Sequence, residues 1–401
     1  MSYKKIKEGL YSVGILNPNL RVFDIVMKTD FGTSYNSYVI KDKKNALIET
    51  CHHRFFDEYV ENIQSVIPLN DIDYIILNHT EPDHSGALER LAELCKNAKI
   101  LCSRAASVYL KSIVNNDSIK FDVVKDGDIL NLGSLDLKFI AAPFLHWPDT
   151  MFTYCEGLKT VFTCDFLGSH FCEPNVTDTR ISYPEKYKTA LKGYFNDIFS
   201  PFIPYVRAGL EKLESVEFDT ACVSHGPVLT DRGFLECALE SYKTWSKEKT
   251  RTALCLPVFY CSAYGYTRKL AETAVSEIKK LVKDAETSAY DIIEHNMEDL
   301  ASVMNGSDGF MIGSPTLNRN AVSPVRELLA MIDVINGQKK PIGVFGSYGW
   351  SGEAVPSIVA ELKSLRLQTI GEGLKINFYP SEDDLEKMRL YTKEFCGAFN
   401  R

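Results

Sequence analysis

Short apolar runs alternate with amphipathic stretches along the first 250 residues of the chain. Amphipathic patterns at 55–65, 85–96 and 104–114 predict helices, because apolar positions recur there at the helical period. The apolar runs carry β-branched residues and end in turn residues, so they predict strands. The expected strands cover residues 34–40, 45–50, 74–78, 99–103 and 135–142.

Two segments of the same region predict hairpins. Residues 127–140 form an expected strand pair around a turn at Gly133, and residues 151–166 form another around Glu156–Gly157. A helical stretch at about 186–215 and a last buried strand at 218–227 follow. Hairpins mixed with helical crossovers predict two packed sheets with helices outside, an α+β sandwich of the αββα type.

The pattern changes after a polar segment at 242–252, which we interpret as a helix end and a linker. Beyond it, strands and helices alternate regularly, which predicts an α/β domain with a doubly wound parallel sheet. The expected strands are 253–261, 286–292, 309–315, 339–348 and 368–378. The expected helices are 266–283, 296–305, 322–336, 353–365 and 381–398. We therefore predict two domains, residues 1–250 and residues 251–401.

Composition narrows the class of protein. The 401 residues are 45% hydrophobic and 24% charged, and the formal net charge of −8 argues against a nucleic-acid or anionic-membrane partner. The chain has no leader-like N-terminus and no apolar run of about 18 residues, so we expect no membrane span. The eleven cysteines include no C-x-x-C pair, which argues against a zinc ribbon and predicts free thiols in the cytoplasm.

Candidate metal ligands gather in the segment NHTEPDH, directly after an expected strand. Pro82 stiffens the turn by fixing its own φ, so side chains at the carboxyl end of the strand converge in one crevice. Further candidates each lie just past another apolar strand. The seven candidates are His79, Glu81, Asp83, His84, His146, Asp165 and His225. A lone histidine in such a place is usually structural, but this set predicts a metal centre, and if Asp165 bridges, two metals receive four ligands each.

A phosphate-binding loop is predicted in VFYCSAYGYTRKLAE, a strand, loop and helix at 258–272. Hydroxyls and backbone N–H groups at a helix start form an anion site, and Gly265 lets the backbone approach a phosphate. The chain has no G-x-G-x-x-G and no Walker lysine, so a dinucleotide or nucleoside triphosphate fits less well. The spacing S-x-x-G-x-T resembles the phosphate loop of flavodoxins, which bind FMN.

Two more loops, 313–320 and 346–354, follow neighbouring strands and complete the expected FMN site. Tyr348 and Trp350 offer apolar surface for an isoalloxazine ring, and the alternative for Trp350 is core packing. The FMN-binding candidates are Ser262, Ala263, Tyr264, Gly265, Tyr266, Thr267, Ser314, Pro315, Thr316, Leu317, Asn318, Ser347, Tyr348, Gly349, Trp350, Ser351 and Gly352.

The metal candidates resemble the metallo-β-lactamase superfamily, an αββα sandwich with H-x-H-x-D-H in this position. Here Glu81 replaces the second histidine, and the added carboxylate favours iron over zinc. With the flavodoxin-like half, this substitution resembles the flavodiiron protein family over essentially the whole chain. The resemblance implies one iron on His79, Glu81 and His146, a second on Asp83, His84 and His225, and Asp165 between them. The run CDFLGSH departs from the family's usual Asp-Ala-Phe-Gly, which leaves the surroundings of Asp165 open.

The resemblance implies a terminal oxidoreductase that passes electrons from FMN to a non-haem di-iron centre. Two electrons on the flavin and two on ferrous ions match the four that reduce O2 to water; NO reduction to N2O is equally compatible. The chain ends after one helix, so we expect a separate donor, a rubredoxin or a flavin/NADH-linked reductase. The family further implies a head-to-tail homodimer, with a dimer of dimers as a larger alternative.

Two other functions are weighed against this one. A zinc-dependent metallo-β-lactamase-type hydrolase with a flavodoxin-like accessory domain would use zinc to activate water. An electron carrier or flavin sensor would hold no metal. Glu81 and the complete ligand set argue against both, and metal analysis separates the three.

Several aromatic side chains lie outside these sets. His170 is expected either to line the substrate pocket or to make a structural hydrogen bond. We expect His52 and His53 at the start of a helix and His295 on the surface. Trp147 is expected either at a dimer surface or in the core.

Overall fold

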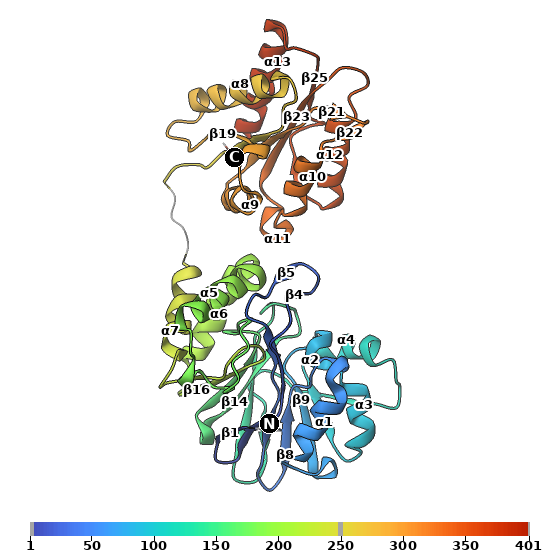
Figure 1. The fold of residues 1–401 in the computed structure, drawn as a ribbon, viewed down its shortest axis with the longest axis vertical. Helices are drawn as coiled ribbons and strands as arrows, with labels where there is room; N and C mark the ends of the chain where they lie inside the picture. The colour runs from blue at the N-terminus through green and yellow to red at the C-terminus, as the bar shows by residue number, and fades with distance from the viewer. Residues whose placement is uncertain (1–3, 248–251, 400–401) are drawn as a thin grey trace. The chain divides into compact units, whose positions relative to one another are not determined.

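The structure, a computed structural model, describes residues 4–247 and 252–399. It divides the chain into two compact units, Met1–Glu248 and Lys249–Arg401 (Figure 1). The predicted domain boundary at residue 250 lies outside the described residues.

The first unit is built on two sheets with helices outside, which confirms the predicted αββα sandwich (Figure 1). The first sheet runs in the order β1 (Lys4–Lys7), β2 (Leu10–Ser12), β7 (Tyr38–Ile40), β8 (Asn45–Ile48), β9 (Ile72–Leu77), β10 (Lys99–Cys102) and β11 (Phe121–Val123). The second runs β12 (Ile129–Asn131), β13 (Asp136–Ala141), β14 (Met151–Cys155), β15 (Thr160–Cys164), β16 (Thr220–Val223) and β17 (Leu229–Thr230). Two short antiparallel strand pairs, β3 (Ile15–Asn17) with β6 (Thr33–Tyr35) and β4 (Val22–Phe23) with β5 (Met27–Lys28), lie off these sheets.

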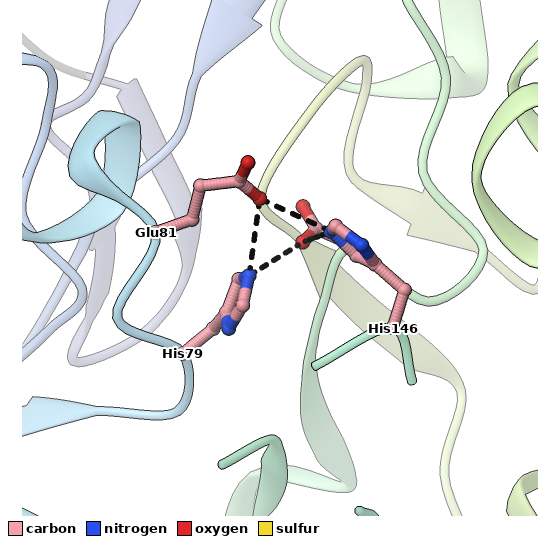
Figure 2. Close-up of side chains that lie close together, drawn as sticks. His79, Glu81 and His146 are labelled. Atoms are coloured by element: carbon pink, nitrogen blue, oxygen red, sulfur yellow. Dashed lines mark hydrogen bonds and ion pairs between the residues drawn. The ribbon is translucent and has the colours of Figure 1, made fainter. Parts of the chain in front are cut away.

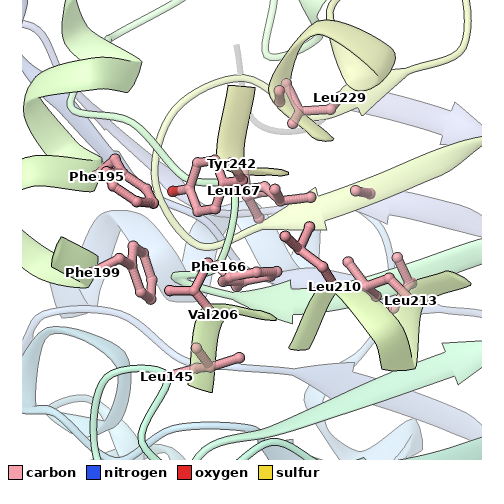
Figure 3. Close-up of a cluster of buried hydrophobic side chains, with 14 of the residues drawn as sticks. Leu145, Phe166, Leu167, Phe195, Phe199, Val206, Leu210, Leu213, Leu229 and Tyr242 are labelled. Atoms are coloured by element: carbon pink, nitrogen blue, oxygen red, sulfur yellow. The ribbon is translucent and has the colours of Figure 1, made fainter. Parts of the chain in front are cut away.

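Helices cover the outer face of each sheet, and apolar side chains fill the layers. The first sheet carries α1 (Phe56–Gln64), α2 (Pro82–Ser85), α3 (Leu88–Leu94) and α4 (Arg104–Val114) on one side (Figure 1). The second sheet packs against α5 (Pro184–Tyr194), α6 (Ile203–Glu214) and α7 (Leu235–Trp245). Figure 3 shows this second core, where Phe166, Phe199 and Tyr242 lie together. Their rings meet at centroid distances of 5.1 to 5.7 Å, a spacing at which aromatic pairs stabilise a core.

The helix α4 illustrates how local sequence produces these elements. Ala106, Leu110 and Val114 are buried and recur every fourth residue, so one face of the helix packs on the sheet. The Ser103 hydroxyl accepts a hydrogen bond from the N–H of Ala106 at 3.1 Å and caps the first turn. Asn115 ends the helix in the left-handed region, at a φ of 50°.

The predicted helical stretch at about 186–215 is confirmed, and the structure divides it into several elements. The structure ends α5 at Tyr194, continues through a π-helical turn and a 3₁₀ turn, and starts α6 at Ile203. Pro201 explains the break, because proline has no backbone N–H to continue the helical hydrogen bonds. Pro204 then occupies the first turn of α6, where its fixed φ suits a helix start.

The second unit is a parallel sheet with helices on both faces, as predicted. Its strand order is β19 (Ala289–Asp291), β18 (Val258–Tyr260), β20 (Phe310–Gly313), β23 (Pro341–Tyr348) and β24 (Gln368–Thr369). One face packs on α8 (Tyr266–Leu281) and α13 (Glu382–Gly397). The other packs on α9 (Met297–Gly306), α10 (Ser323–Ala330) and α12 (Ala354–Ser364), with α11 (Val334–Gly337) following α10.

Two elements of this unit differ from the predicted ones. The expected strand 368–378 is split into β24 and β25 (Leu374–Asn377), and both pair with β23. Gly371 and Gly373 lie between them with positive φ, a conformation that glycine adopts without strain. The expected helix 322–336 is divided into α10 and α11, with the carboxylate of Asp333 capping the second piece. Among the described residues, no helix is long and apolar enough to span a membrane.

Candidate functional site

The seven predicted metal ligands lie together at the ends of strands in the first unit. β9 ends at Leu77 before the turn that carries four of them, and β15 and β16 end just before Asp165 and His225. Their ligand atoms form two groups, each within 4.8 Å. One group is His79, Glu81, His146 and Asp165, and the other is Asp83, His84 and His225.

The first group surrounds the carboxylate of Glu81. Figure 2 shows Glu81, His79 and His146 pointing toward one another. Oε2 of Glu81 lies 3.2 Å from Nε2 of His79 and 3.1 Å from Nε2 of His146. Oδ2 of Asp165 lies 3.6 and 3.5 Å from the same two nitrogens. Three side chains therefore converge on one edge of Asp165.

The second group meets the other oxygen of Asp165. Oδ1 lies 3.2 Å from Nε2 of His84 and 3.4 Å from Nε2 of His225. Asp83 completes this group, with its oxygens 3.0 Å from His225 and 3.4 Å from His84. Because each oxygen of Asp165 faces a different group, the carboxylate has the position of a bridge.

The site is strongly charged in the interior. Burial alone would lower the pKa of His84, but Asp83 and Asp165 raise it to about 10. Burial alone would raise the pKa of Asp165, but His84 and His146 hold it well below its usual range. Similarly, hydrogen bonds from His146 and His79 outweigh burial and depress the pKa of Glu81. Such carboxylates attract cations, and a metal ion that binds here would displace protons from the imidazoles.

These residues fit two metal ions. Both oxygens of Asp83, both oxygens of Asp165 and Nε2 of His84 are buried and make no hydrogen bond within the described residues. Buried polar atoms without partners are rare in proteins, and at a cluster of this composition metal coordination accounts for them. The mixture of four imidazoles with three carboxylates suits iron better than a softer thiolate set would.

Sequence reasoning missed the residues that orient the ligands. Asp149 is fully buried, and its Oδ2 lies 3.3 Å from Nδ1 of His79 and 2.8 Å from the backbone nitrogen of Thr80. The carbonyl of Ser34 lies 2.6 Å from Nδ1 of His225. Histidines that bind metals ordinarily donate the other N–H to such acceptors. Asp149 lies three residues after His146, which is the one signal in the sequence that could have suggested it.

The hairpin β4–β5 was also missed, and it lies over this site. Phe23 packs on the rings of His170 and His225 at centroid distances of 4.5 and 5.4 Å. Asp24 follows Phe23, and burial with the neighbouring Glu81 and Asp83 raises its pKa to about 6. Glu81 and His146 are the most exposed ligands, with side-chain exposures of 17% and 15%, so the site opens on their side.

The remaining histidines and Trp147 differ in how they are packed and exposed. His52 precedes and His53 begins a short 3₁₀ helix, and their rings stack 4.4 Å apart. His295 is exposed. Trp147 is half-buried and packs edge-on to His79 at 5.1 Å, so it is neither a core residue nor a fully exposed one.

The predicted flavin residues lie at the carboxyl ends of β18, β20 and β23, on three loops together with the last residues of β23 and the first residues of α8. Gly265 has a φ of 82° at the start of α8, where the hydroxyl of Thr267 lies 2.8 Å from that of Ser347. These hydroxyls join two of the loops beside the N-terminus of α8, where backbone N–H groups favour an anion. Trp350 and Tyr264 are 89% and 80% exposed, so core packing does not explain Trp350. The loop 313–320 contains a small unpredicted hairpin, β21 (Thr316–Leu317) with β22 (Asn320–Ala321).

Arg268 braces the first of these loops, and sequence reasoning missed it. Its backbone N–H donates to the hydroxyl of Ser262 at 3.2 Å. Its guanidinium donates to the hydroxyl of Tyr260 and to Oδ2 of Asp291, both at 3.0 Å. Asp291 is buried at the end of β19, so this arginine ties the loop to the neighbouring strand.

Comparisons with known proteins match both units of the chain. The profile of the ODP family beta lactamase matches residues 33–226, and the flavodoxin profile matches residues 258–390. The flavo-diiron protein FprA2 of Clostridium acetobutylicum is 50% identical over 98% of this chain and 99% of its own. The anaerobic nitric oxide reductase flavorubredoxin of Vibrio vulnificus is 31% identical over 91% of this chain and 73% of its own. The structure of rubredoxin oxygen:oxidoreductase from Desulfovibrio gigas aligns with a TM-score of 0.72 and 26% identity, over 99% of this chain and 98% of that one.

Proposed function

Since the chain belongs to the flavodiiron protein family, we infer that it is an oxidoreductase that passes electrons from FMN to a non-haem di-iron centre, where O2 is reduced to water, NO to N2O, or both. The observation that carries this function is the position of Asp165 between two groups of ligands, one of which contains Glu81. Bound iron and FMN would supply the redox chemistry.

The residues of the chain hold and shield these groups. His79, Glu81 and His146 would hold one iron, Asp83, His84 and His225 the other, and Asp165 would serve both. Asp83, His84 and His225 are almost fully buried, which keeps bulk water from the second position. The loops around Ser262–Thr267, Ser314–Asn318 and Ser347–Gly352 would hold FMN.

Metal and flavin analysis of the purified chain tests this function. We expect iron near two per chain together with FMN, in protein produced with iron and zinc both supplied. Zinc in place of iron would support a hydrolase instead. FMN without any metal would support an electron carrier.

We propose that electrons reach FMN from a separate rubredoxin or a flavin/NADH-linked reductase. A relative named rubredoxin oxygen:oxidoreductase supports the first of these donors. We also propose a cytoplasmic location, which the eleven free cysteines support, because free thiols are usual in a reducing compartment.

We further propose a head-to-tail homodimer in which the flavin of one chain faces the di-iron site of the other, with a dimer of dimers as the larger alternative. Each site is made of loops from its own unit. The turn that follows Phe23 over the metal site ends in Ile25 and Val26, which are 93% and 79% exposed, and Trp350 is exposed at the flavin loops. Adjoining exposed apolar side chains such as Ile25 and Val26 favour an association surface, and a two-fold dimer would bury both sets at once.

Mixed dimers test this arrangement. A chain without metal (His79→Ala) is co-expressed with a chain altered at the phosphate loop (Thr267→Glu), and each homodimer serves as a control. Neither homodimer should turn over, whereas the mixed dimer should, because one intact flavin meets one intact metal site. Mixed dimers confirmed by mass that remain inactive would rule out transfer between chains.

A further inference from the structure

His170 is fixed by the same strand that fixes the ligand His225. In β6, the carbonyl of Ser34 lies 2.6 Å from Nδ1 of His225. The hydroxyl of the preceding residue, Thr33, lies 3.0 Å from Nδ1 of His170. The two rings are 5.4 Å apart between centroids. In each imidazole the anchored Nδ1 leaves Nε2 on the other edge of the ring.

The two Nε2 atoms have different surroundings. Nε2 of His225 lies 3.0 Å from Asp83 and 3.4 Å from Asp165, within the second ligand group. His170 belongs to neither ligand group. Its Nε2 is buried and makes no hydrogen bond within the described residues. Leaving such an atom unpaired is unfavourable, so a buried histidine with a purely structural role is expected to have both nitrogens bonded.

The ring of His170 has no freedom to turn toward solvent. It is 6% exposed and is held between Phe23, at a centroid distance of 4.5 Å, and Tyr194, at 4.8 Å. These contacts fix the position of the ring, and among the described residues no protein atom hydrogen-bonds its Nε2. A small molecule that hydrogen-bonds to Nε2 is therefore the remaining way to satisfy this atom.

We propose that His170 is a substrate-positioning residue, whose Nε2 hydrogen-bonds a water molecule, or the diatomic substrate that replaces it, beside the Asp83–His84–His225 metal position. This inference rests on the proposed function, since the substrate is that of the di-iron centre. His170 then contributes to how firmly a small ligand is held, while the seven other residues hold the metals.

Azide binding to the oxidised, iron-loaded protein tests the proposal without turnover. His170→Phe keeps a ring but removes both nitrogens, and loss of one hydrogen bond should raise the Kd of azide about threefold to tenfold. Iron and FMN content should not change. His295→Phe is the matched control, because His295 is an exposed histidine of the other unit, and its azide Kd should stay that of the wild type. Thr33→Val, which removes the hydrogen bond at Nδ1 but keeps the ring contacts, should weaken azide binding by a smaller factor.

Two outcomes would overturn the proposal: an unchanged azide Kd in iron-loaded His170→Phe protein, or loss of iron from that variant, which would make His170 part of the metal site. The wild-type protein gives a second test that needs no variant. A crystal structure at high resolution should place an ordered water within hydrogen-bonding distance of Nε2, and a protein partner there instead would contradict the proposal. A wild-type protein without iron would contradict the proposed function itself, so the two failures are distinguishable.

Discussion

Nδ1 of His79 lies 3.3 Å from Oδ2 of Asp149, and Nε2 of the same ring lies 3.2 Å from Oε2 of Glu81. The buried carboxylate therefore fixes which nitrogen of His79 faces the metal position. The same oxygen of Asp149 accepts hydrogen bonds from the backbone and the hydroxyl of Thr80, each at 2.8 Å. Asp149 thus ties the ligand turn to the loop that carries His146.

Replacing Asp149 by asparagine should weaken the first metal position selectively. The amide keeps the size of the side chain but lacks the charge that favours the Nδ1–H form of His79. Outer partners of this kind typically contribute about tenfold to a hundredfold to metal affinity. Competition with a chelator measures the loss, and Asp122→Asn, an exposed aspartate of β11, is the control. Equal metal affinity in Asp149→Asn and the wild type would show that Asp149 has no such role.

Glu81→His should shift the metal preference from iron toward zinc. The carboxylate is the hard ligand in the first group, and an imidazole in its place restores the ligand pattern of the lactamases. We expect loss of oxidase activity with FMN still bound, because the flavin loops lie in the other unit. Metal analysis and flavin absorbance measure both effects. A variant with two irons and normal turnover would contradict the argument from ligand type.

Asp165→Ala and His225→Ala should differ in the number of metals lost. The two oxygens of Asp165 face both groups, whereas Nε2 of His225 faces only the second. We expect the first variant to lose both metals and the second to lose chiefly one. Anomalous scattering gives the occupancy of each position. If Asp165→Ala retained one fully occupied iron, Asp165 would not be the bridge.

Asp291→Asn should loosen FMN although Asp291 lies outside the predicted flavin loops. The charged hydrogen bond from Arg268 to Asp291 holds the loop that contains Ser262. Because the Arg268 side chain is partly exposed, losing this charge should raise the Kd of FMN only about threefold to tenfold. Fluorescence titration of FMN into flavin-free protein measures this. Glu294→Gln removes the more distant and exposed partner of the same arginine, so it should have the smaller effect. If both variants raised the Kd of FMN equally, the hydrogen bond between Arg268 and Asp291 would have no special role in holding the loop.

The sequence was sufficient for the architecture because strand-end positions are local features. A turn that follows β9 must present its side chains at the sheet edge, so the positions of His79 and Glu81 followed from the order of residues alone. Asp149 and Ser34 could not be found this way, because their contacts with His79 and His225 depend on how distant loops pack. Pro201 and Gly371 interrupt two of the expected elements. The hydrophobic pattern continues on both sides of each residue, so the pattern alone did not show the breaks.

Single-turnover reoxidation tests the electron path most directly. The protein is fully reduced at flavin and iron, then mixed with O2 or with NO in a stopped-flow instrument, with His79→Ala as the variant lacking an intact metal site. The account predicts that flavin reoxidation is fast in the wild type with at least one of the two gases, without accumulation of hydrogen peroxide, and slow in the variant. Flavin reoxidation at the same rate in both proteins, with hydrogen peroxide as the product, would contradict it.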